Sequence, residues 1–385
     1  MSNTPLIRFA GFTDAWEQRK LGDIGETYTG LSGKTKEDFG HGNAAFVTYM
    51  NVFSNPIADS AMTESVEIDK KQNEVKYGDV FFTTSSETPD EVGMSSVWLE
   101  NGENTYLNSF CFGYRPSVEI NPFYMAYMLR SDSVRKNIVF LAQGISRYNI
   151  SKNKMMEISV PSPTLEEQRK IGEYFRNLDT LITLHQRKCD ALQRFKRAML
   201  QKMFPQHGES VPEIRFAGFT DAWEQRKLEE VITVGNGMDY KHLSEGDIPV
   251  YGTGGYMLSV DKALSYYKDA IGIGRKGTID KPYILKAPFW TVDTLFYCIP
   301  KEDFSLDFVY CIFQNVNWKE KDESTGVPSL SKVNINSTNV TVPTLAEQEK
   351  IGAYFSYLDN LITLHQRKLE TLQKMKKSLL QKMFV

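Results

Sequence analysis

The sequence predicts an α+β protein with two α/β domains, two long antiparallel coiled-coil helices between them, and a pseudo-two-fold internal repeat. Two duplications support this prediction. The fifteen letters IRFAGFTDAWEQRKL at 7–21 return unchanged at 214–228, and residues 165–204 return at 345–384 with 26 of 40 positions identical. The first offset is 207 residues and the second is 180, so the segments between the copies have diverged in length. A period of about 200 residues is typical of duplicated domains and not of a solenoid.

The diverged stretches, X (24–160) and Y (231–340), both have the pattern of a mixed α/β domain. Runs of β-branched and aromatic residues predict strands at 44–53 and 78–86 in X, and at 248–257, 270–279 and 290–299 in Y. Each domain is then expected to contain a short helix, at 121–138 in X and at 305–316 in Y.

The two copied stretches of forty residues predict long helices. Each opens with the capping-box pattern T-x-x-E directly after a proline, at Thr164–Glu167 and at Thr344–Glu347. A heptad seam follows in both copies, formed by Ile171, Tyr174, Leu178, Leu181, His185, Lys188, Leu192, Phe195 and Met199 and by Ile351, Tyr354, Leu358, Leu361, His365, Lys368, Leu372, Met375 and Leu379. At ~1.5 Å per residue, each rod is about 60 Å long.

The order of the repeats predicts the direction of these helices. The first helix leaves X and ends just before the second copy of the fifteen letters, so the second helix should end near the first copy. The helices are therefore expected to run antiparallel, with the two ends of the chain close together. His185 should lie opposite His365 as the polar step that sets the register of the pair. Two histidines are too few ligands for a metal site, so no metal is expected.

Four segments follow from this layout. The predicted boundaries are 1–163 for the first domain, 164–204 for the first long helix, 205–343 for the second domain and 344–385 for the second long helix.

Length and composition limit the class of protein. A chain of 385 residues is too long for one ordinary core, and 41% hydrophobic with 12% aromatic residues excludes general disorder. No apolar run reaches the length of a membrane span and the first residues lack a secretory signal, so a soluble cytoplasmic protein is expected. The four cysteines form no CxxC pair and are expected to be free, buried thiols.

Three stretches resemble parts of enzymes, and none completes a catalytic site. Asn121-Pro122-Phe123-Tyr124 approximates a motif of amino-methyltransferases, but asparagine followed by proline is also an ordinary helix start. The glycine-rich stretches 251–256 and 272–279 do not match a P-loop. Pro89-Asp90 begins a nuclease-like pattern without its Glu-x-Lys partner. No catalytic residue and no cofactor are therefore expected.

Polar loop residues in X and Y are suited to contact with double-stranded DNA. Lysine and arginine can hold phosphates, while arginine, asparagine, serine and threonine can read base edges. The candidates are Thr84, Ser85, Arg147, Tyr148, Asn149, Ser151 and Lys152 in X, and Arg275, Lys276, Thr278, Thr294, Ser331 and Lys332 in Y. Each is equally consistent with a solvated surface loop. Because the long helices carry 16 basic and 9 acidic residues, the rest of the chain has 29 basic against 39 acidic, and a DNA-facing surface would be a minority patch.

The whole layout resembles the specificity (S) subunit of type I restriction–modification enzymes. The residues that carry the resemblance are FAGFTDAWEQRKLGD at 9–23, NISKNKMMEISVPSPTLEEQRKIG at 149–172, IPVYGTGGY at 248–256, IGRKGTI at 273–279 and VPTLAEQEKIG at 342–352. The resemblance covers nearly the whole chain. Its most specific element is the Pro-Thr-Leu-x-Glu-Gln sequence that opens each long helix.

The resemblance implies that X and Y are target-recognition domains, each of which reads one half of an interrupted, asymmetric DNA site. The helices would set the gap between the half-sites. The copied segments would dock two modification (methyltransferase) subunits through Phe9, Phe12, Trp16, Phe216, Phe219, Trp223, Tyr174, Phe175, Tyr354 and Phe355. Methyl transfer and ATP-driven cleavage would belong to the modification and restriction subunits of the full complex, so this chain is expected not to be an enzyme.

A protein-interaction scaffold without DNA binding is the competing interpretation. It explains the helices and the copied segments, but not why two α/β domains diverge between fixed flanks. A stand-alone adenine methyltransferase is disfavoured because no glycine-rich cofactor loop follows a strand.

Overall fold

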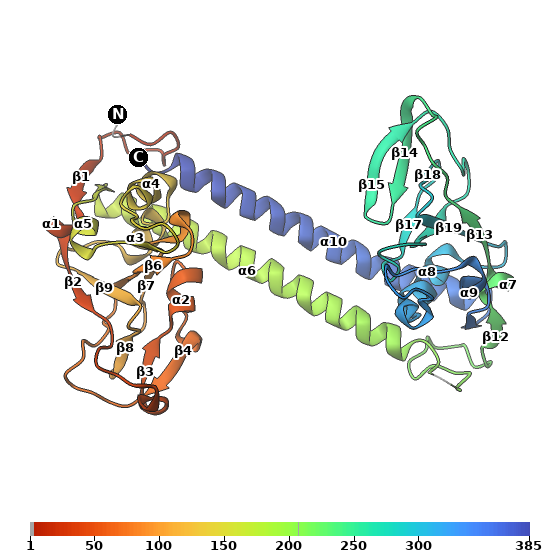
Figure 1. Ribbon diagram of the computed structural model, residues 1–385, viewed down its shortest axis with the longest axis horizontal. Coiled ribbons are helices and arrows are strands. Elements are labelled where there is room, and N and C mark those ends of the chain that lie inside the picture. The colour runs from red at the N-terminus through yellow and green to blue at the C-terminus, as the bar shows by residue number, and fades with distance from the viewer. Residues whose placement is uncertain (1–3, 207) are drawn as a thin grey trace. The chain divides into compact units, whose positions relative to one another are not determined.

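The computed structural model describes residues 4–206 and 208–385, which form two compact units (Figure 1). Unit 1 comprises Met1–His185 with Lys368–Val385, and unit 2 comprises Gln186–Arg367. Each unit therefore contains one α/β domain and parts of both long helices. This composition confirms the predicted fold class of two duplicated α/β domains with two long helices.

Unit 1 contains two main sheets. The larger has the antiparallel order β2 (Gly25–Thr29), β9 (Cys111–Pro116), β5 (Val80–Thr83), β7 (Ser95–Val97), and the smaller has the order β4 (Thr63–Val66), β3 (Phe39–Val47), β8 (Thr105–Leu107). Two short ladders join distant segments, β1 (Glu17–Lys20) with β11 (Ser159–Ser162) and β6 (Ser85–Ser86) with β10 (Tyr148–Asn149). The helices are α1 (Leu21–Ile24), α2 (Tyr49–Ser54), α3 (Pro122–Met128), α4 (Asp132–Phe140) and α5 (Lys152–Met156).

Unit 2 repeats this topology. Its larger sheet has the order β13 (Ile232–Asn236), β19 (Leu295–Pro300), β16 (Ala270–Gly274), β17 (Tyr283–Leu285), and its smaller sheet has the order β15 (Gly255–Val260), β14 (Glu245–Gly252), β18 (Trp290–Thr291). The strand β12 (Glu224–Lys227) pairs with β20 (Asn339–Val342) as β1 pairs with β11. The helical elements are α7 (Leu228–Val231), α8 (Leu306–Asn315), the 3₁₀ turn η4 (Trp318–Lys321) and α9 (Lys332–Asn336).

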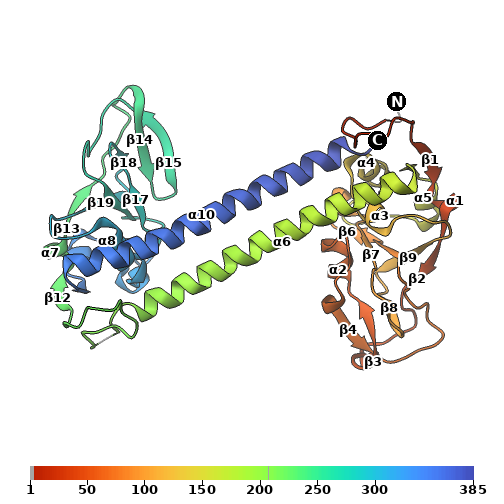
Figure 2. The same ribbon diagram turned by 180° about the vertical axis from the view of Figure 1, so that it is seen from behind.

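The long helices α6 (Leu165–Lys202) and α10 (Leu345–Lys382) each have 38 residues, a length of about 57 Å (Figures 1 and 2). In unit 1, Phe175 and Asp179 of α6 contact Phe384 and Lys376, respectively. Rising numbers in α6 thus meet falling numbers at the end of the chain, so the helices run antiparallel there. None of the helices in the described ranges is long and apolar enough to cross a bilayer.

Unit 2 contains the repeat-related contacts. Lys196 pairs with Asp359 at 2.6 Å, and the rings of Phe204 and Phe355 lie 6.4 Å apart. These residues correspond to Lys376, Asp179, Phe384 and Phe175 of unit 1 at the offset of 180 residues. The antiparallel direction is therefore the same in both units, as the order of the repeats predicts.

The predicted heptad seam is wrong at three of its nine positions in the first copy and at two of nine in the second, where the side chains are exposed. Ile171, Leu178 and their equivalents are buried, whereas Leu181 and Phe195 are 44% and 45% exposed. The neighbouring positions take their place in the core, as buried Phe175, Cys189 and Lys196 show. A seam with alternating steps of three and four can be drawn in two ways from the same starting residue. The correct seam includes Lys196, and a charged residue is not expected in a buried seam.

Some shorter elements also differ from the prediction. The predicted strand at 44–53 ends at Val47, because the Thr48 side chain accepts the Asn51 N–H and starts α2. The predicted helix at 121–138 is interrupted at 129–131 between α3 and α4. The predicted strand at 248–257 is a hairpin of β14 and β15, which turns at 253–254.

The copied fifteen-letter segment lies against the end of a long helix in each unit. In unit 1 the N–H of Ile7 donates to the carbonyl of Lys382 at 3.0 Å, and in unit 2 the N–H of Ile214 donates to that of Lys202 at 2.9 Å. Phe384 and Phe204, just beyond these carbonyls, are buried against Trp16 and Trp223, respectively. Segments close to the two ends of the chain, around Ile7 and Lys382, therefore lie together in unit 1, as the repeat order predicts (Figure 1).

Candidate functional site

The short ladder of β6 and β10 brings together most of the candidate residues in unit 1. Ser85 pairs with Asn149, and the N–H of Ile150 donates to the carbonyl of Thr84 at 3.0 Å. The N–H and hydroxyl of Thr84 both donate to the carbonyl of Phe110, at 3.1 and 2.8 Å. Segments about 65 residues apart in sequence thus form one polar edge, which we call ladder 1 (residues 84–86 and 147–152).

The remaining candidates of X flank ladder 1. Arg147 is exposed, and its carbonyl accepts a hydrogen bond from Asn149 Nδ2 at 3.3 Å. Ser151 precedes α5. The ammonium of Lys152 lies 5.9 Å from the ring of buried Phe112 on the central strand β9. The structure thus places these residues beside one another, while their contact with DNA stays a prediction.

An equivalent ladder exists in unit 2. Lys276 bridges to Ser329, and the N–H of Leu330 donates to the carbonyl of Arg275 at 3.0 Å. The N–H of Arg275 donates in turn to the carbonyl of Thr294 at 2.8 Å. We call this arrangement ladder 2 (residues 275–276 and 327–332).

The backbone hydrogen bonds align the two ladders residue by residue. The bond from Ile150 to Thr84 corresponds to that from Leu330 to Arg275, so Arg275 occupies the place of Thr84. By the same rule Thr294 occupies the place of Phe110. Ser151-Lys152 and Ser331-Lys332 are identical and directly follow the equivalent residues Ile150 and Leu330. The frame is conserved between the units while the side chains on it differ.

Ladder 2 borders a pocket of about 430 Å³. The pocket is lined by Asn236, Arg275, Lys276, Phe296, Glu323, Ser329, Leu330, Ser331 and Lys332. The guanidinium of Arg275 lies 5.8 Å from the ring of Phe296, and three cations face one carboxylate here. Burial raises the pKa of the Cys298 thiol on β19, an effect that the nearby Lys332 ammonium opposes. The site is therefore a positively charged pocket lined by one aromatic ring, that of Phe296.

Three candidates of Y contribute less than their side chains suggest. The hydroxyl of Ser331 accepts the N–H of Asn334 at 3.1 Å and thereby caps α9. Thr294 contributes its backbone carbonyl to ladder 2. Thr278 lines a separate pocket of about 520 Å³, next to the ion pair of Lys319 with Asp280. Ser331 therefore lines the pocket with its hydroxyl already used as a helix cap, whereas Thr294 and Thr278 do not line it.

The copied segments close each unit through a buried ion pair that sequence reasoning missed. Arg8 donates two hydrogen bonds to Glu167 at 2.7 and 2.8 Å, and Arg215 donates two to Glu347 at the same distances. Both carboxylates are buried, and the hydrogen bonds raise the pKa of each arginine. Bidentate pairs of this kind are strong and directional. The signal was present in the sequence, because both partners recur in both copies.

The glutamine that follows each buried glutamate ties the helix to its domain. Gln168 accepts the N–H of Asn121, which caps α3, and donates to the carbonyl of Pro163. Gln348 accepts the N–H of Ser305 and donates to the carbonyl of Pro343 in the same way. The Leu-x-Glu-Gln element therefore has a structural role in both units. Asn121-Pro122 forms the start of α3, which is the ordinary interpretation of this sequence.

Part of the aromatic set predicted to contact a partner lies inside the units. Trp16, Trp223, Phe175 and Phe355 are at most 3% exposed, so they pack the cores and leave almost no surface for another protein. These four residues therefore recur in both copies because each core needs them for packing.

The other six aromatic residues of that set are partly exposed and repeat the same contacts. Phe9 packs edge-on against Tyr174 at 5.8 Å, and Phe216 packs against Tyr354 at 6.0 Å. Lys170 lies 4.7 Å from the ring of Phe12, and Lys350 lies 4.8 Å from that of Phe219. We call these groups patch 1 (Phe9, Phe12, Lys170, Tyr174) and patch 2 (Phe216, Phe219, Lys350, Tyr354).

His185 and His365 are half-buried at seam positions of α6 and α10. Whether they face each other stays a prediction.

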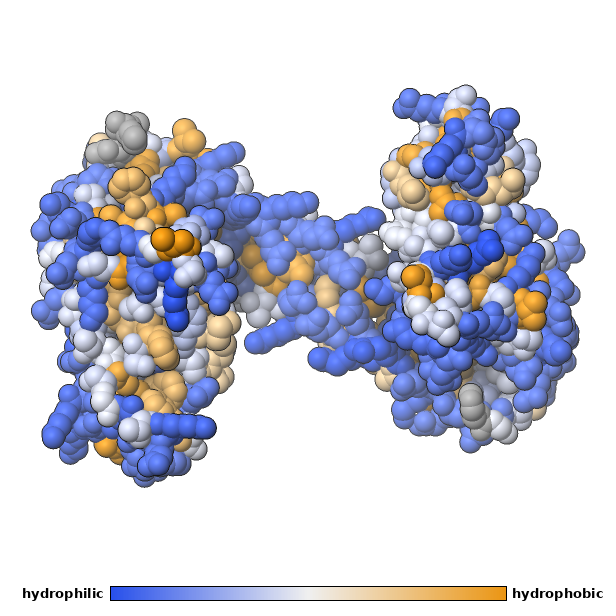
Figure 3. Space-filling view, viewed as in Figure 1, coloured by the Kyte–Doolittle hydropathy of each residue, from blue (hydrophilic) through white to orange (hydrophobic). Residues whose placement is uncertain are grey.

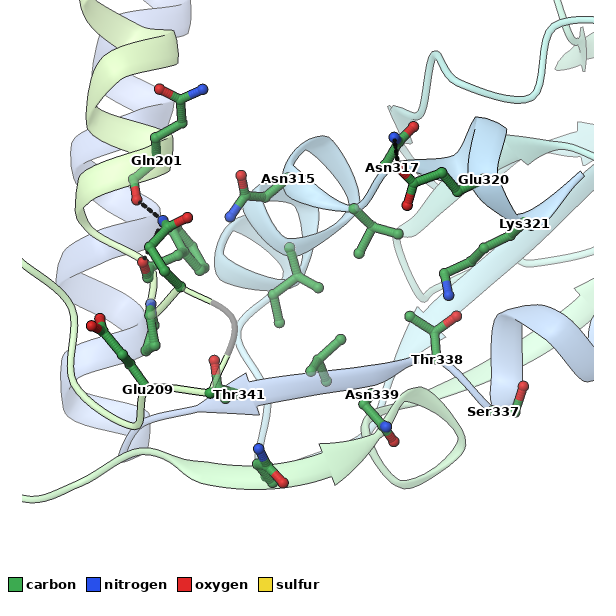
Figure 4. Close-up of a pocket in the computed structure, with 18 residues that line it drawn as sticks. Gln201, Glu209, Asn315, Asn317, Glu320, Lys321, Ser337, Thr338, Asn339 and Thr341 are labelled. Atoms are coloured by element: carbon green, nitrogen blue, oxygen red, sulfur yellow. Dashed lines mark hydrogen bonds between the residues drawn. The ribbon is translucent and has the colours of Figure 1, made fainter.

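A larger polar pocket of about 730 Å³ lies in unit 2 between the end of α6, the α8–η4 segment and β20 (Figure 4). Figure 4 shows Asn315, Asn317 and Glu320 on one side and Thr338, Asn339 and Thr341 on the other. Asn317 donates to Glu320 at 2.8 Å. Within residues 4–206 and 208–385, no group of three or more His, Cys, Asp or Glu residues is arranged to hold a metal ion. The four cysteines are free and buried.

The visible surfaces of both units are largely hydrophilic, with scattered apolar side chains (Figure 3). The two units are therefore copies of one α/β domain, each with a different polar ladder and each with the same bidentate arginine–glutamate pair.

The chain matches the family model described as the type I restriction modification DNA specificity domain, over residues 13–194 and 220–374. It belongs to that family. As a member, it is a specificity subunit of the type I restriction–modification class and not an enzyme.

Individual relatives agree with this membership. The putative type I restriction enzyme MjaX specificity subunit of Methanocaldococcus jannaschii is 23% identical over 95% of this chain and 92% of its own length. The crystal structure of a type I S subunit from M. genitalium matches with a TM-score of 0.69 at 17% identity and covers 99% of both chains. A structure from a study of type I complex assembly matches with a TM-score of 0.54 at 14% identity, over 95% of this chain and 96% of that one.

Proposed function

We propose that ladder 1 and ladder 2 each read one half of an interrupted, asymmetric site in double-stranded DNA. The observation that carries this proposal is the residue-by-residue alignment of the ladders, which keeps the backbone and changes the side chains. Exposed arginine and lysine side chains, such as Arg147, Arg275 and Lys332, suit phosphate and base contacts, whereas Ser85 and Ser86 are buried. A scaffold without DNA binding would give no reason for this divergence between identical closures.

The domain boundaries of the proposal are those expected from the sequence. Residues 1–163 and 205–343 are the two target-recognition domains, and 164–204 and 344–385 are the spacer helices that fix the gap. Helices of about 57 Å are long enough to separate two readers by one to two turns of duplex, since one turn is roughly 34–36 Å. The subunit would act in the cytoplasm, where it has access to genomic DNA.

Two copies of the modification subunit dock on patches 1 and 2 in this proposal. The patches consist of the same four residue types in the same contacts, so one partner surface fits both. Restriction subunits would belong to the full complex as well. Buried Trp16, Phe175, Trp223 and Phe355 would act by holding the patches in shape.

Domain replacement tests the reading proposal. Residues 24–160 would be exchanged for the corresponding segment of another type I specificity subunit, and methylated sites would be mapped in cells that carry the matching modification subunit. One half of the site should change completely, while the other half and the gap stay the same. A change in both halves, or in neither, would contradict the division between X and Y.

Substitutions in patches 1 and 2 test the assembly. Phe12→Ala should remove one modification subunit from the purified complex, Phe219→Ala should remove one, and the double variant should remove both. Mass photometry measures the stoichiometry. Tyr267→Ala is the matched control, because this side chain is 96% exposed and belongs to neither patch. Full assembly of the double variant would show that the partner binds elsewhere.

A further inference from the structure

We propose that each half-site contains one guanine, read by Arg147 in unit 1 and by Arg275 in unit 2, and that Lys152 and Lys332 hold backbone phosphates. This inference rests on the function proposed above and assigns different tasks to the residues of each ladder.

The arginines of X are few, and all but one are committed to the fold. Arg115 pairs with buried Asp79 at 2.7 Å. Arg130 donates to the carbonyls of Ser95, Val52, Phe53 and Asn55, and Arg135 donates to those of Gly93, Asp90 and Val92. Burial lowers the pKa of each of these two guanidinium groups to about 10. Arg147, which lies on ladder 1, is the arginine of X that remains.

Arg147 is exposed and forms no ion pair with any residue that the structure describes. Its N–H groups are thus available for an external acceptor. It lies directly before Tyr148, which pairs with Ser86 across ladder 1.

Y contains a single arginine, Arg275, and it lies on ladder 2. Its side chain is exposed and makes no ion pair within the described ranges. Its Nη1 donates to the carbonyl of Asp293 at 3.5 Å, a distance beyond that of an ordinary hydrogen bond. The ring of Phe296 below it supports the planar group at 5.8 Å. Each diverged domain therefore has one uncommitted arginine, and in both domains it lies on the ladder.

The two arginines occupy opposite strands of their ladders. The position of Arg147 is taken by Val327 in unit 2, and that of Arg275 is taken by Thr84 in unit 1. A residue that contacted phosphate alone would be equally useful at the same place in both units, since every sequence has the same backbone. The exchange of strands instead fits a contact that depends on sequence. The guanidinium fork matches O6 and N7 of guanine in the major groove, the commonest specific contact of arginine.

The lysines behave in the opposite way. Lys152 and Lys332 occupy the same position in both units, directly after a serine and at the first residue of α5 and α9. Each lies close to the central strand of its sheet, near Phe112 in unit 1 and near Phe296 and Cys298 in unit 2. A cation repeated at one place beside two different readers suits the one feature that both half-sites share, the phosphate backbone.

Binding of the complete complex with its modification subunits to a panel of duplexes tests this assignment. The duplexes would carry each of the four bases at every position of both half-sites, and affinity would be measured at several salt concentrations. Arg147→Ala should abolish a preference for guanine of about tenfold or more at one position of the first half-site. Arg275→Ala should do the same in the second half-site. Each variant should leave the other half unchanged.

The lysine variants are the matched controls. Lys152→Ala and Lys332→Ala should weaken binding to all duplexes by the same factor, keep every base preference and reduce the slope of log affinity against log salt by about 0.9. An arginine variant that behaves in this way would overturn the assignment, as would an arginine variant with unchanged binding. Because both arginine side chains are exposed, thermal unfolding of the variants should match that of the wild-type protein.

Failure of the broader function would look different. If the wild-type complex showed no base preference that depends on residues 24–160 or 231–340, the reading function itself would be wrong. If the preference exists but survives both arginine variants, only the present inference fails.

Discussion

Units 1 and 2 share their fold and the arginine–glutamate pair that joins the copied segment to the long helix. They differ in the side chains of ladder 1 and ladder 2. Arg8 with Glu167 and Arg215 with Glu347 have the same distances, as do the helix contacts of Phe175 and Phe355 with their partners to within 0.6 Å. The ladders keep their hydrogen bonds but exchange threonine for arginine. Identical residues therefore hold each unit together, while diverged residues are free to define what each unit recognises.

This comparison changes the meaning of the copied fifteen letters. Identity at two places suggests one partner bound twice, and patches 1 and 2 agree with that interpretation. Two of the fifteen positions are nevertheless buried in each unit, Trp16 and Leu21 in unit 1 and Trp223 and Leu228 in unit 2, and packing in the core is a separate reason for their identity. Duplication of a protein-binding surface and duplication of a core give the same sequence signal.

The largest expected effect comes from removing the second half of the chain, residues 214–385. A fragment of residues 1–213 keeps the first domain and α6 but loses Leu379, Leu380, Met383 and Phe384, which pack in the core of unit 1. The sequence QKMF at 201–204 is identical to that at 381–384, so a second fragment can fill the same place. The fragment should dimerise antiparallel with a true two-fold axis, because an exposed apolar stripe of this length is unfavourable.

With modification subunits, this dimer should methylate a palindromic interrupted site built from the first half-site twice. Analytical ultracentrifugation measures the dimer, and mapping of methylated bases measures the site. Phe204→Ala in the fragment is the control, since it removes the ring that replaces Phe384. A folded monomeric fragment, or methylation of the original asymmetric site, would contradict the equivalence of the two units.

A smaller effect is expected from the paired charges on the helix seam. Lys196 is 10% exposed at its side chain and pairs with Asp359, whereas Lys376 is 22% exposed and pairs with Asp179. Asp359→Ala leaves the more buried ammonium without its carboxylate and should lower the free energy of unfolding by about 2–3 kcal/mol. Asp179→Ala should lower the free energy of unfolding by about 1 kcal/mol.

Chemical denaturation measures both values. Glu173→Ala on the exposed face of α6 should change the free energy of unfolding by less than about 0.5 kcal/mol. Equal losses for the two aspartate variants would show that burial of the lysine does not decide the strength of these pairs.

The sequence predicted the framework of the molecule better than its details. The capping pattern at Thr164 predicted the start of α6 to within one residue, because local chemistry decides where a helix begins. The seam was wrong at Phe195 because the core accepts Lys196 when Asp359 is near, and local periodicity cannot reveal a pairing between distant residues. The strand predicted at 44–53 was wrong beyond Val47 because Thr48 caps a helix there.

The candidate site shows the same limit. Thr84 and Arg275 were both chosen as polar loop residues, but nothing in the sequence showed that they occupy one position of one ladder. Their segments align only through hydrogen bonds to Ile150 and Leu330, far along the chain. Which residues of a diverged domain are equivalent is a property of the fold.

The smallest predicted effect concerns two tryptophans with identical sequence surroundings. Trp16 donates its indole N–H to Glu167 at 3.0 Å, whereas the indole nitrogen of Trp223 is buried with no hydrogen-bond partner among the described residues. Substitution by phenylalanine removes similar apolar area at both positions, so that loss cancels in the comparison. Trp16→Phe also removes a hydrogen bond to a buried carboxylate, while Trp223→Phe removes an unsatisfied donor.

Trp16→Phe should therefore lower the free energy of unfolding by about 1–2 kcal/mol more than Trp223→Phe. Denaturation monitored by hydrogen exchange in each unit measures the two losses separately, because each variant destabilises its own unit first. Arg8 keeps its two bonds to Glu167 in the Trp16 variant, so the carboxylate stays paired and the unit should remain folded. Equal losses of unfolding free energy in the two variants would show that the hydrogen bond of Trp16 does not contribute to stability.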